Sequence, residues 1–92
     1  MTDILQQRLK ASPDAFASAV GDETVLLQFK RGVYYGLDAV GTRIWVGLND
    51  GQAPAEICQQ IAAEHGVPIE TVEADARTFL QDLKANDIVV AD

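Results

Sequence analysis

Apolar and polar residues alternate in the first half of the chain, and this alternation predicts three short strands. We expect strands over residues 16–20, 23–29 and 33–37, because alternate positions of a strand face opposite sides of its sheet. The turns between them, at residues 21–22 and 30–32, are short, and short turns join antiparallel neighbours. The pattern therefore predicts an antiparallel meander whose third strand lies at an edge.

The side chains of these strands divide between two faces. In the second strand, Val25, Leu27 and Phe29 share one face. In the third strand, Tyr34 and Tyr35 point to opposite faces because they are neighbours in the chain. We expect Tyr35 at the margin of the core and Tyr34 at the surface or in a contact.

The second half of the chain has the period of 3.6 residues that is typical of amphipathic helices. We expect helices over residues 39–48, from Pro54 to a stop at Gly66, and over residues 69–85, with Asp38 as the cap of the first. The last helix carries an apolar stripe made of Val72, Ala76, Phe79 and Leu83. Strands followed by helices predict an α+β fold, a three-stranded antiparallel sheet followed by three helices, in a winged helix-turn-helix-like arrangement.

The two ends of the chain are less regular. Residues 1–14 are polar with scattered apolar positions, and we expect a poorly ordered N-terminal arm there, followed by one domain over residues 15–92. The tail holds the apolar run Ile88, Val89 and Val90. It is expected to form a final strand or to cover the core.

Composition narrows the class of partner. The 92 residues include 7 Lys and Arg against 14 Asp and Glu, a formal net charge of −7. A surface of this sign repels nucleic acid, so a protein or peptide partner, such as a basic peptide, is expected. The N-terminus has no apolar signal segment, and no apolar run is long enough to cross a membrane. We therefore expect a cytoplasmic protein with no membrane partner.

The candidate catalytic residues are few. Cys58, the one cysteine, lies on the inner side of the predicted second helix, and His65, the one histidine, follows seven residues later. That spacing is too long for a thiol–imidazole pair within one helix, and a nucleophilic cysteine needs such a base. We expect a buried Cys58, no metal, no cofactor and no catalytic activity. A Cys58 enzyme remains the alternative, which Cys58→Ala would inactivate.

The predicted edge strand offers a binding mode. An edge carries unpaired N–H and C=O groups, and an extended peptide, or the edge of a second copy in a homodimer, can pair with them. The last predicted helix carries Glu70, Glu73, Asp75 and Asp82. These side chains do not suit a DNA recognition helix, although a winged-helix DNA-binding or interaction domain stays open as an alternative. Glu73 and Arg77 are spaced as an exposed ion pair.

Two segments resemble the PqqD-like family. The first is GVYYGLDAVGTRIW at residues 32–45, and the second is VEADARTFL at residues 72–80, followed by Leu83. The two motifs together are more specific than either alone, and the resemblance spans about residues 15–91.

The resemblance implies a RiPP recognition element, a winged-helix-like domain that performs no chemistry. Such a domain binds the leader segment of a ribosomally made precursor peptide and presents it to a leader peptidase and other modifying enzymes. The leader adds as a strand to the third strand and lies against the third helix. On this basis the leader-binding residues are expected to be Val33, Tyr34, Tyr35, Leu37, Asp75, Ala76, Phe79, Asp82 and Leu83.

The turn at residues 30–32 bears on the pathway. The family member that serves pyrroloquinoline quinone synthesis usually has Pro-Glu-Gly there, whereas this chain has Lys30-Arg31-Gly32. The remaining pattern is most similar to the stand-alone leader-binding proteins of lasso peptide biosynthesis. A peptide chaperone for another RiPP or for a quinone-cofactor pathway is the alternative within the family.

Overall fold

The structure is a computed structural model, and it describes residues 3–21 and 23–92. Its elements follow the chain in the order η1 (Ile4–Gln6), β1 (Leu9–Ala11), β2 (Ala15–Val20), β3 (Glu23–Gln28), β4 (Val33–Leu37), α1 (Ala39–Asn49), α2 (Pro54–His65), α3 (Ile69–Ala85) and β5 (Val89–Ala91). The predicted α+β class, a three-stranded antiparallel sheet followed by three helices, is confirmed.

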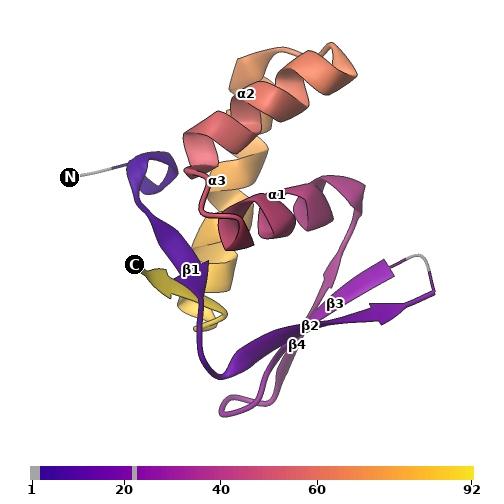
Figure 1. The fold of residues 1–92 in the computed structure, drawn as a ribbon, viewed down its shortest axis with the longest axis vertical. Coiled ribbons are helices and arrows are strands. Elements are labelled where there is room, and N and C mark those ends of the chain that lie inside the picture. The colour runs from indigo at the N-terminus through magenta and orange to yellow at the C-terminus, as the bar shows by residue number, and fades with distance from the viewer. Residues whose placement is uncertain (1–2, 22) are drawn as a thin grey trace.

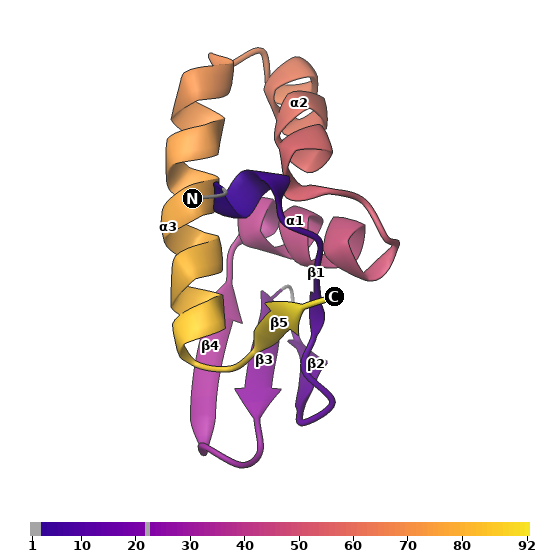
Figure 2. The ribbon, with the colours of Figure 1, turned by 90° about the vertical axis from the view of Figure 1, so that its left-hand side faces the viewer.

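The main sheet has the order β2-β3-β4, with both neighbouring pairs antiparallel. β4 is therefore an edge strand, as predicted. The sheet projects below the helices, and α3 runs down beside β4 (Figures 1 and 2). Of the predicted turn at residues 21–22, Asp22 lies outside the described residues, while the second turn contains Gly32 in a left-handed conformation with φ 63°.

Local signals at the helix ends explain where the helices begin and end. The Asp38 carboxylate accepts a hydrogen bond of 2.7 Å from the Gly41 N–H and so caps α1. Pro54 occupies the first turn of α2, and Gly66 ends that helix with φ 63°. These caps and breakers act over a few residues, and so the sequence predicts the helix bounds closely.

The N-terminal segment differs from the expected loose arm. Residues 1–2 lie outside the described residues, but Ile4 and Leu5 are buried in η1, and β1 pairs with β5. The Asp3 carboxylate lies 2.7 Å from the Arg77 guanidinium, which lowers the pKa of Asp3. Arg77 thus pairs with Asp3, although the i,i+4 spacing indicated Glu73. The tail forms β5 and supplies the partner strand that β1 needs.

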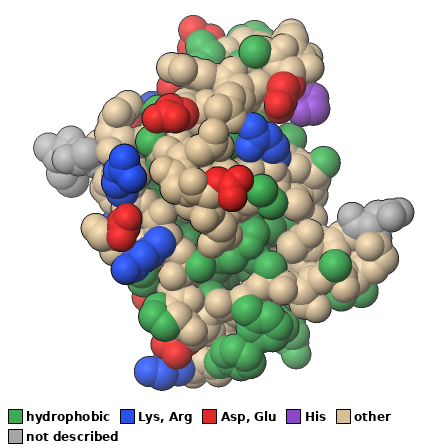
Figure 3. Space-filling model, viewed as in Figure 1, with side chains coloured by type: hydrophobic (Ala, Val, Ile, Leu, Met, Phe, Trp, Pro, Cys, Tyr) green, Lys and Arg blue, Asp and Glu red, His purple; other side chains and the backbone are tan. Residues whose placement is uncertain are grey.

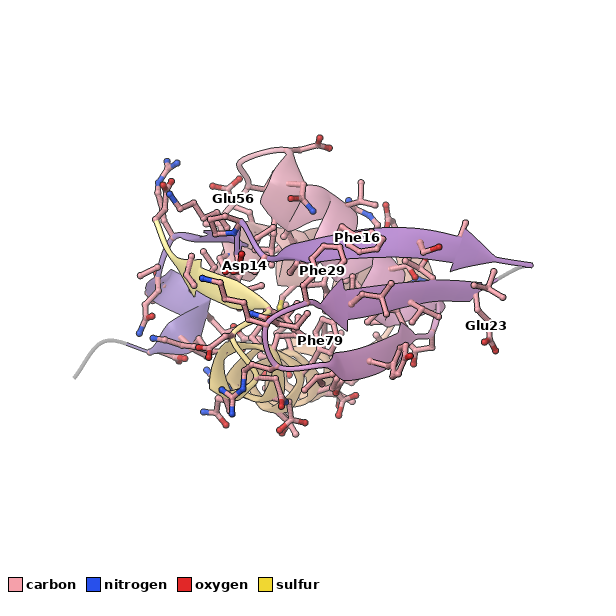
Figure 4. All side chains as sticks on the ribbon, turned by 90° about the horizontal axis from the view of Figure 1, so that it is seen from below. Asp14, Phe16, Glu23, Phe29, Glu56 and Phe79 are labelled. Carbon is pink, nitrogen blue, oxygen red and sulfur yellow. The ribbon has the colours of Figure 1, made fainter. Side chains whose placement is uncertain are left out.

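The sheet buries the face that carries Leu26 and Gln28, which are 0% and 3% exposed. The face with Val25, Leu27 and Phe29 points away from the helices, and there Phe29 stacks on Phe16 with ring centroids 4.7 Å apart. Figure 4 shows these two rings on the strands, and Figure 3 shows hydrophobic side chains gathered at that end of the molecule. The sheet therefore keeps an exposed apolar outer face.

The core lies between the inner face of the sheet and the three helices. It joins buried residues of β3, β4 and every helix, among them Leu26, Leu37, Trp45, Ile57 and Leu80. Among the described residues, no helix combines the length and the apolar character that spanning a bilayer requires. This core fixes α3 against the helices and leaves its outward side beside the free edge of β4.

Candidate peptide-binding site

The candidate site lies where the free edge of β4 runs beside α3. We call it the β4–α3 site and define it by β4 and by the α3 side chains Asp75, Phe79 and Asp82. Tyr35 of β4 reaches across to α3, where its ring meets the Phe79 ring edge-on at 5.8 Å. Its hydroxyl donates a long hydrogen bond of 3.4 Å to the Asp82 carboxylate. These contacts form the link between strand and helix on which a peptide would rest.

At the free edge of β4, two residues direct their backbone N–H and C=O groups away from the sheet. On the β4 side of β3, the Gln28 carbonyl accepts from the Gly32 N–H, whereas on the β2 side the Phe29 N–H donates to the Asp14 carbonyl. Antiparallel pairing alternates bonded and non-bonded positions, so the register directs Val33, Tyr35 and Leu37 toward β3. The N–H and C=O groups of Tyr34 and Gly36 therefore point outward and are available to another strand.

A pocket of about 220 Å³ lies beyond the Leu37 end of β4, between α1 and α3. We call it the Phe79 pocket. Gly41 lies on the α1 side of this pocket, where a Cβ would meet the Asp38 carboxylate at a tight 3.3 Å and the Phe79 ring at an ordinary contact distance of 3.5 Å. The pocket has an apolar interior with two carboxylates at its margin, and its lining residues are Asp38, Val40, Gly41, Ile44, Asp75, Ala76 and Phe79.

Polar contacts hold the other end of the site together. The Arg31 guanidinium lies 2.8 Å from the Asp87 carboxylate and donates to the Ala85 carbonyl at 3.1 Å. The buried Gln28 amide donates to the Asp87 carbonyl at 3.0 Å, and its oxygen accepts from the backbone of Lys30. The turn before β4 is thereby attached to the end of α3, which fixes the position of the strand relative to the helix.

The electrostatic character of the site is acidic. Asp38, Asp75 and Asp82 are exposed along it. Burial, and then the nearby Asp82 carboxylate, raise the pKa of Tyr35, so its hydroxyl stays protonated at neutral pH and remains a donor. A peptide with a basic side chain near one of these carboxylates would fit the site better than an acidic one.

The residues considered for catalysis lie elsewhere. Cys58 is buried in α2, and burial raises the pKa of its thiol, which opposes the thiolate that nucleophilic attack requires. His65 is exposed at the end of α2. Within residues 3–21 and 23–92, no group of three His, Cys, Asp or Glu side chains could hold a metal ion. Neither Cys58 nor His65 belongs to the β4–α3 site as defined above.

The leader-binding residues expected from the sequence lie in different environments in the structure. Tyr35, Phe79 and Asp82 contact one another, while Asp75 and Ala76 line the Phe79 pocket. Tyr34 is 76% exposed on the outer face, and Val33 is half-buried. Leu37 and Leu83 are buried in the core and line none of the described pockets at this site.

The sequence reasoning missed several residues of the site. It assigned Asp38 only as a helix cap and gave Val40 and Ile44 no role beyond membership of the first predicted helix, yet all three line the Phe79 pocket. It gave no role to Arg31 or Gln28, whose partners lie more than 50 residues away. A buried glutamine in a strand beside a Lys-Arg turn is the local signal that could have indicated such an anchor.

The fold as a whole is similar to that of known proteins. The family model described as "Coenzyme PQQ synthesis protein D (PqqD)" matches residues 23–89. A solved structure of TbiB1 in complex with the TbiA(beta) leader peptide is 44% identical in sequence, with 90% of this chain and 99% of that chain covered and a TM-score of 0.80. A lasso peptide synthetase B1 complexed with its leader peptide is 25% identical, with 90% and 98% covered and a TM-score of 0.82. No curated protein matches. The chain belongs to the PqqD family, and the predicted resemblance to lasso peptide leader-binding proteins is confirmed.

Proposed function

We propose that the protein binds the leader segment of a ribosomally made lasso peptide precursor and performs no chemistry on it. The leader adds as a strand to β4 and lies against α3. The observation that carries this function is the free β4 edge, with Tyr34 and Gly36 directed outward, beside an apolar pocket on α3. The likeness to two proteins solved with leader peptides supports it.

A titration of isotope-labelled protein with the synthetic TbiA(beta) leader tests this function. We expect amide shifts to concentrate on residues 33–37 and 75–83, because those residues form the β4–α3 site. Hydrogen exchange at Tyr34 and Gly36 should slow as their N–H groups become bonded. Shifts confined to α2, or no shifts with the leader in excess, would refute the proposal.

Asp82→Lys should weaken leader binding by about tenfold. It replaces a carboxylate that attracts a basic leader residue with a positive charge that repels it. The matched variant is Glu73→Lys. Glu73 lies on roughly the opposite side of α3, since successive residues turn by about 100°. Calorimetry at two salt concentrations measures both, and the Asp82→Lys loss should shrink at high salt. Equal losses for the two variants would mean that this carboxylate does not face the leader.

The proposal includes delivery of the bound leader to the leader peptidase of the same pathway. The exposed outer face of the sheet supports this step, because its apolar side chains adjoin Tyr34 and thus the strand that receives the leader. Exposed apolar patches mark protein contacts. A peptidase resting on Phe16, Leu27 and Phe29 would therefore lie next to the added strand.

Phe29→Ser should leave leader affinity unchanged and slow leader cleavage by the pathway's peptidase about tenfold, because a 68% exposed aromatic ring is lost from the contact. Val20→Ser, at the far end of the same face, is the control, and with this variant the peptidase should cleave the leader at the normal rate. Cleavage assays at limiting concentrations of this protein measure the difference. A normal cleavage rate with Phe29→Ser would exclude this face as the peptidase contact.

A further inference from the structure

The edge of the main sheet that lies opposite the β4–α3 site is also free. Within the described residues, β2 pairs with β3 alone, and Figure 4 shows it as an outer strand of the sheet. The six residues of β2, AFASAV at 15–20, include no charged residue and no proline. Charged side chains and proline commonly prevent edge strands from pairing with another chain. The β2 edge therefore lacks this protection.

The register of β2 with β3 decides which backbone groups reach the free edge. The Phe29 N–H donates to the Asp14 carbonyl, and the positions of β2 that bond to β3 recur from there at every second residue. The positions between them are Ala15, Ala17 and Ala19. Their N–H and C=O groups therefore point away from β3, toward the free edge.

These outward groups are complementary to themselves about a twofold axis. When a second copy runs antiparallel with its Ala17 opposite Ala17, each Ala19 lies opposite the partner's Ala15. The two Ala17 residues then exchange both of their N–H···O bonds, and each Ala19 N–H donates to the partner's Ala15 carbonyl. The Ala15 N–H keeps its bond of 3.0 Å to the Ser12 carbonyl. Only methyl groups face each other at these positions, so the two backbones reach a normal strand spacing without a steric conflict.

The outer face of the sheet agrees with this pairing. Phe16 is 39% exposed there, and the same register places it opposite the small Ser18 of the partner. At each end of the paired strands, the Lys30 ammonium lies 3.6 Å from the Asp14 carboxylate. The partner's Glu23 is on the same face, two strands or about 10 Å away. Lys30 therefore lies between carboxylates of both copies, which offsets part of the repulsion between chains that each carry a net charge of −7.

We propose that the β2 edge pairs with the β2 edge of a second copy of this chain, in the register centred on Ala17. The two three-stranded sheets then join into one sheet of six strands. Both β4 edges become its outermost strands, about 24 Å apart at the usual strand spacing, and each stays open to a leader. The interface uses one strand from each copy, so it has the small size of a transient contact.

Introduced cysteines test the register. Cys58 is buried, so the introduced thiol is the accessible one. Oxidation of Ala17→Cys should give a disulfide-linked dimer, because residues opposite each other in a bonded pair have Cα atoms about 5.5 Å apart, which a disulfide spans. Ala19→Cys is the matched control. Ala19 is equally exposed on the same strand, but its two copies lie about 14 Å apart along the strands, and it should cross-link at least tenfold more slowly. Equal rates for the two variants would overturn the proposal.

Sedimentation measures the association without a cross-link. At physiological salt, we expect the native protein to shift from monomer toward dimer as its concentration approaches about 1 mM, the range of a weak contact. Ala17→Pro removes the central donor and should weaken this association at least tenfold, whereas Gly36→Pro, at the β4 edge, should associate like the native protein. A monomer at every concentration would overturn the proposal. So would a loss with Gly36→Pro and not with Ala17→Pro, because the interface would then lie on β4.

The TbiA(beta) leader separates this interface from the proposed function. With the leader in excess, the dimer should persist and each copy should bind one leader, because β2 and β4 are opposite edges of the sheet. A dimer that dissociates as the leader binds would overturn the pairing through β2. A leader that fails to bind, while Ala17→Cys still cross-links faster than Ala19→Cys, would refute the proposed function and support the interface.

Discussion

Gly36→Pro is expected to weaken leader binding by on the order of 100-fold while the protein remains folded. The Gly36 N–H points to the free edge of β4, and proline removes that donor and puts its ring in the path of an incoming strand. A leader carbonyl left without a partner costs about 1–3 kcal/mol, and the steric conflict adds to this. Proline is tolerated on an edge strand whose N–H faces outward, so the pairing of β4 with β3 should persist.

Ala17→Pro provides the matched control for this prediction. The register directs the Ala17 N–H to the free edge of β2, the opposite edge of the same sheet, where α3 is distant. Calorimetric titration with the TbiA(beta) leader should give near-native affinity for Ala17→Pro, and thermal melts should show both variants folded. A loss with Ala17→Pro and not with Gly36→Pro would place the leader on the other edge.

The parts of the fold that the sequence predicts well are those set by neighbouring residues. The bounds of β4 and α3 follow from alternation, from helical periodicity and from flanking turn residues, and the structure has them at Val33–Leu37 and Ile69–Ala85. The N-terminal segment has no such local determinant. Leu9 becomes a strand residue only because Ala91 lies opposite it, and a window of a few residues cannot contain a partner some 80 positions away.

The choice of which face of β3 is buried illustrates a second limit of prediction from the sequence. Three apolar residues indicate one face, but the structure buries the other, which carries Leu26 and Gln28. Burying Gln28 becomes favourable only because its amide finds the Asp87 carbonyl and the backbone of the following turn. The apolar residues that remain outside then form the exposed face next to the β4 edge. Periodicity shows that a strand has two faces, and long-range hydrogen bonds decide between them.

The candidate site shows the same division between local and distant determinants. Helical spacing places Asp75, Phe79 and Asp82 on one side of α3, and in the structure Asp75 and Phe79 line one pocket while Asp82 accepts from the Tyr35 hydroxyl. The same spacing puts Leu83 near that side, yet Leu83 is fully buried. Apolar residues of a helix stripe divide between core and pocket according to the neighbouring elements, and a stripe by itself does not contain that information.

Phe79→Ala and Leu83→Ala should therefore separate binding from stability. Phe79 is half-buried, lines its pocket and meets Tyr35, so its removal should weaken leader binding about 10- to 100-fold, as expected for a lost apolar contact of about 1.5–3 kcal/mol. Leu83 is 0% exposed, and its truncation should lower the free energy of unfolding by about 2–5 kcal/mol. In a domain of this size that corresponds to a fall in melting temperature of roughly 10 °C or more.

The comparison is made at a temperature where both variants are folded, with denaturant melts for stability and calorimetry for affinity. Leu83→Ala should then bind the leader with near-native affinity, because its side chain supports α3 from inside the core. If it loses as much affinity as Phe79→Ala, the leader must penetrate the core side of α3, and the β4–α3 site would have to be redrawn around that face. If Phe79→Ala binds normally, the Phe79 pocket is not a leader anchor, and the strand edge alone carries recognition.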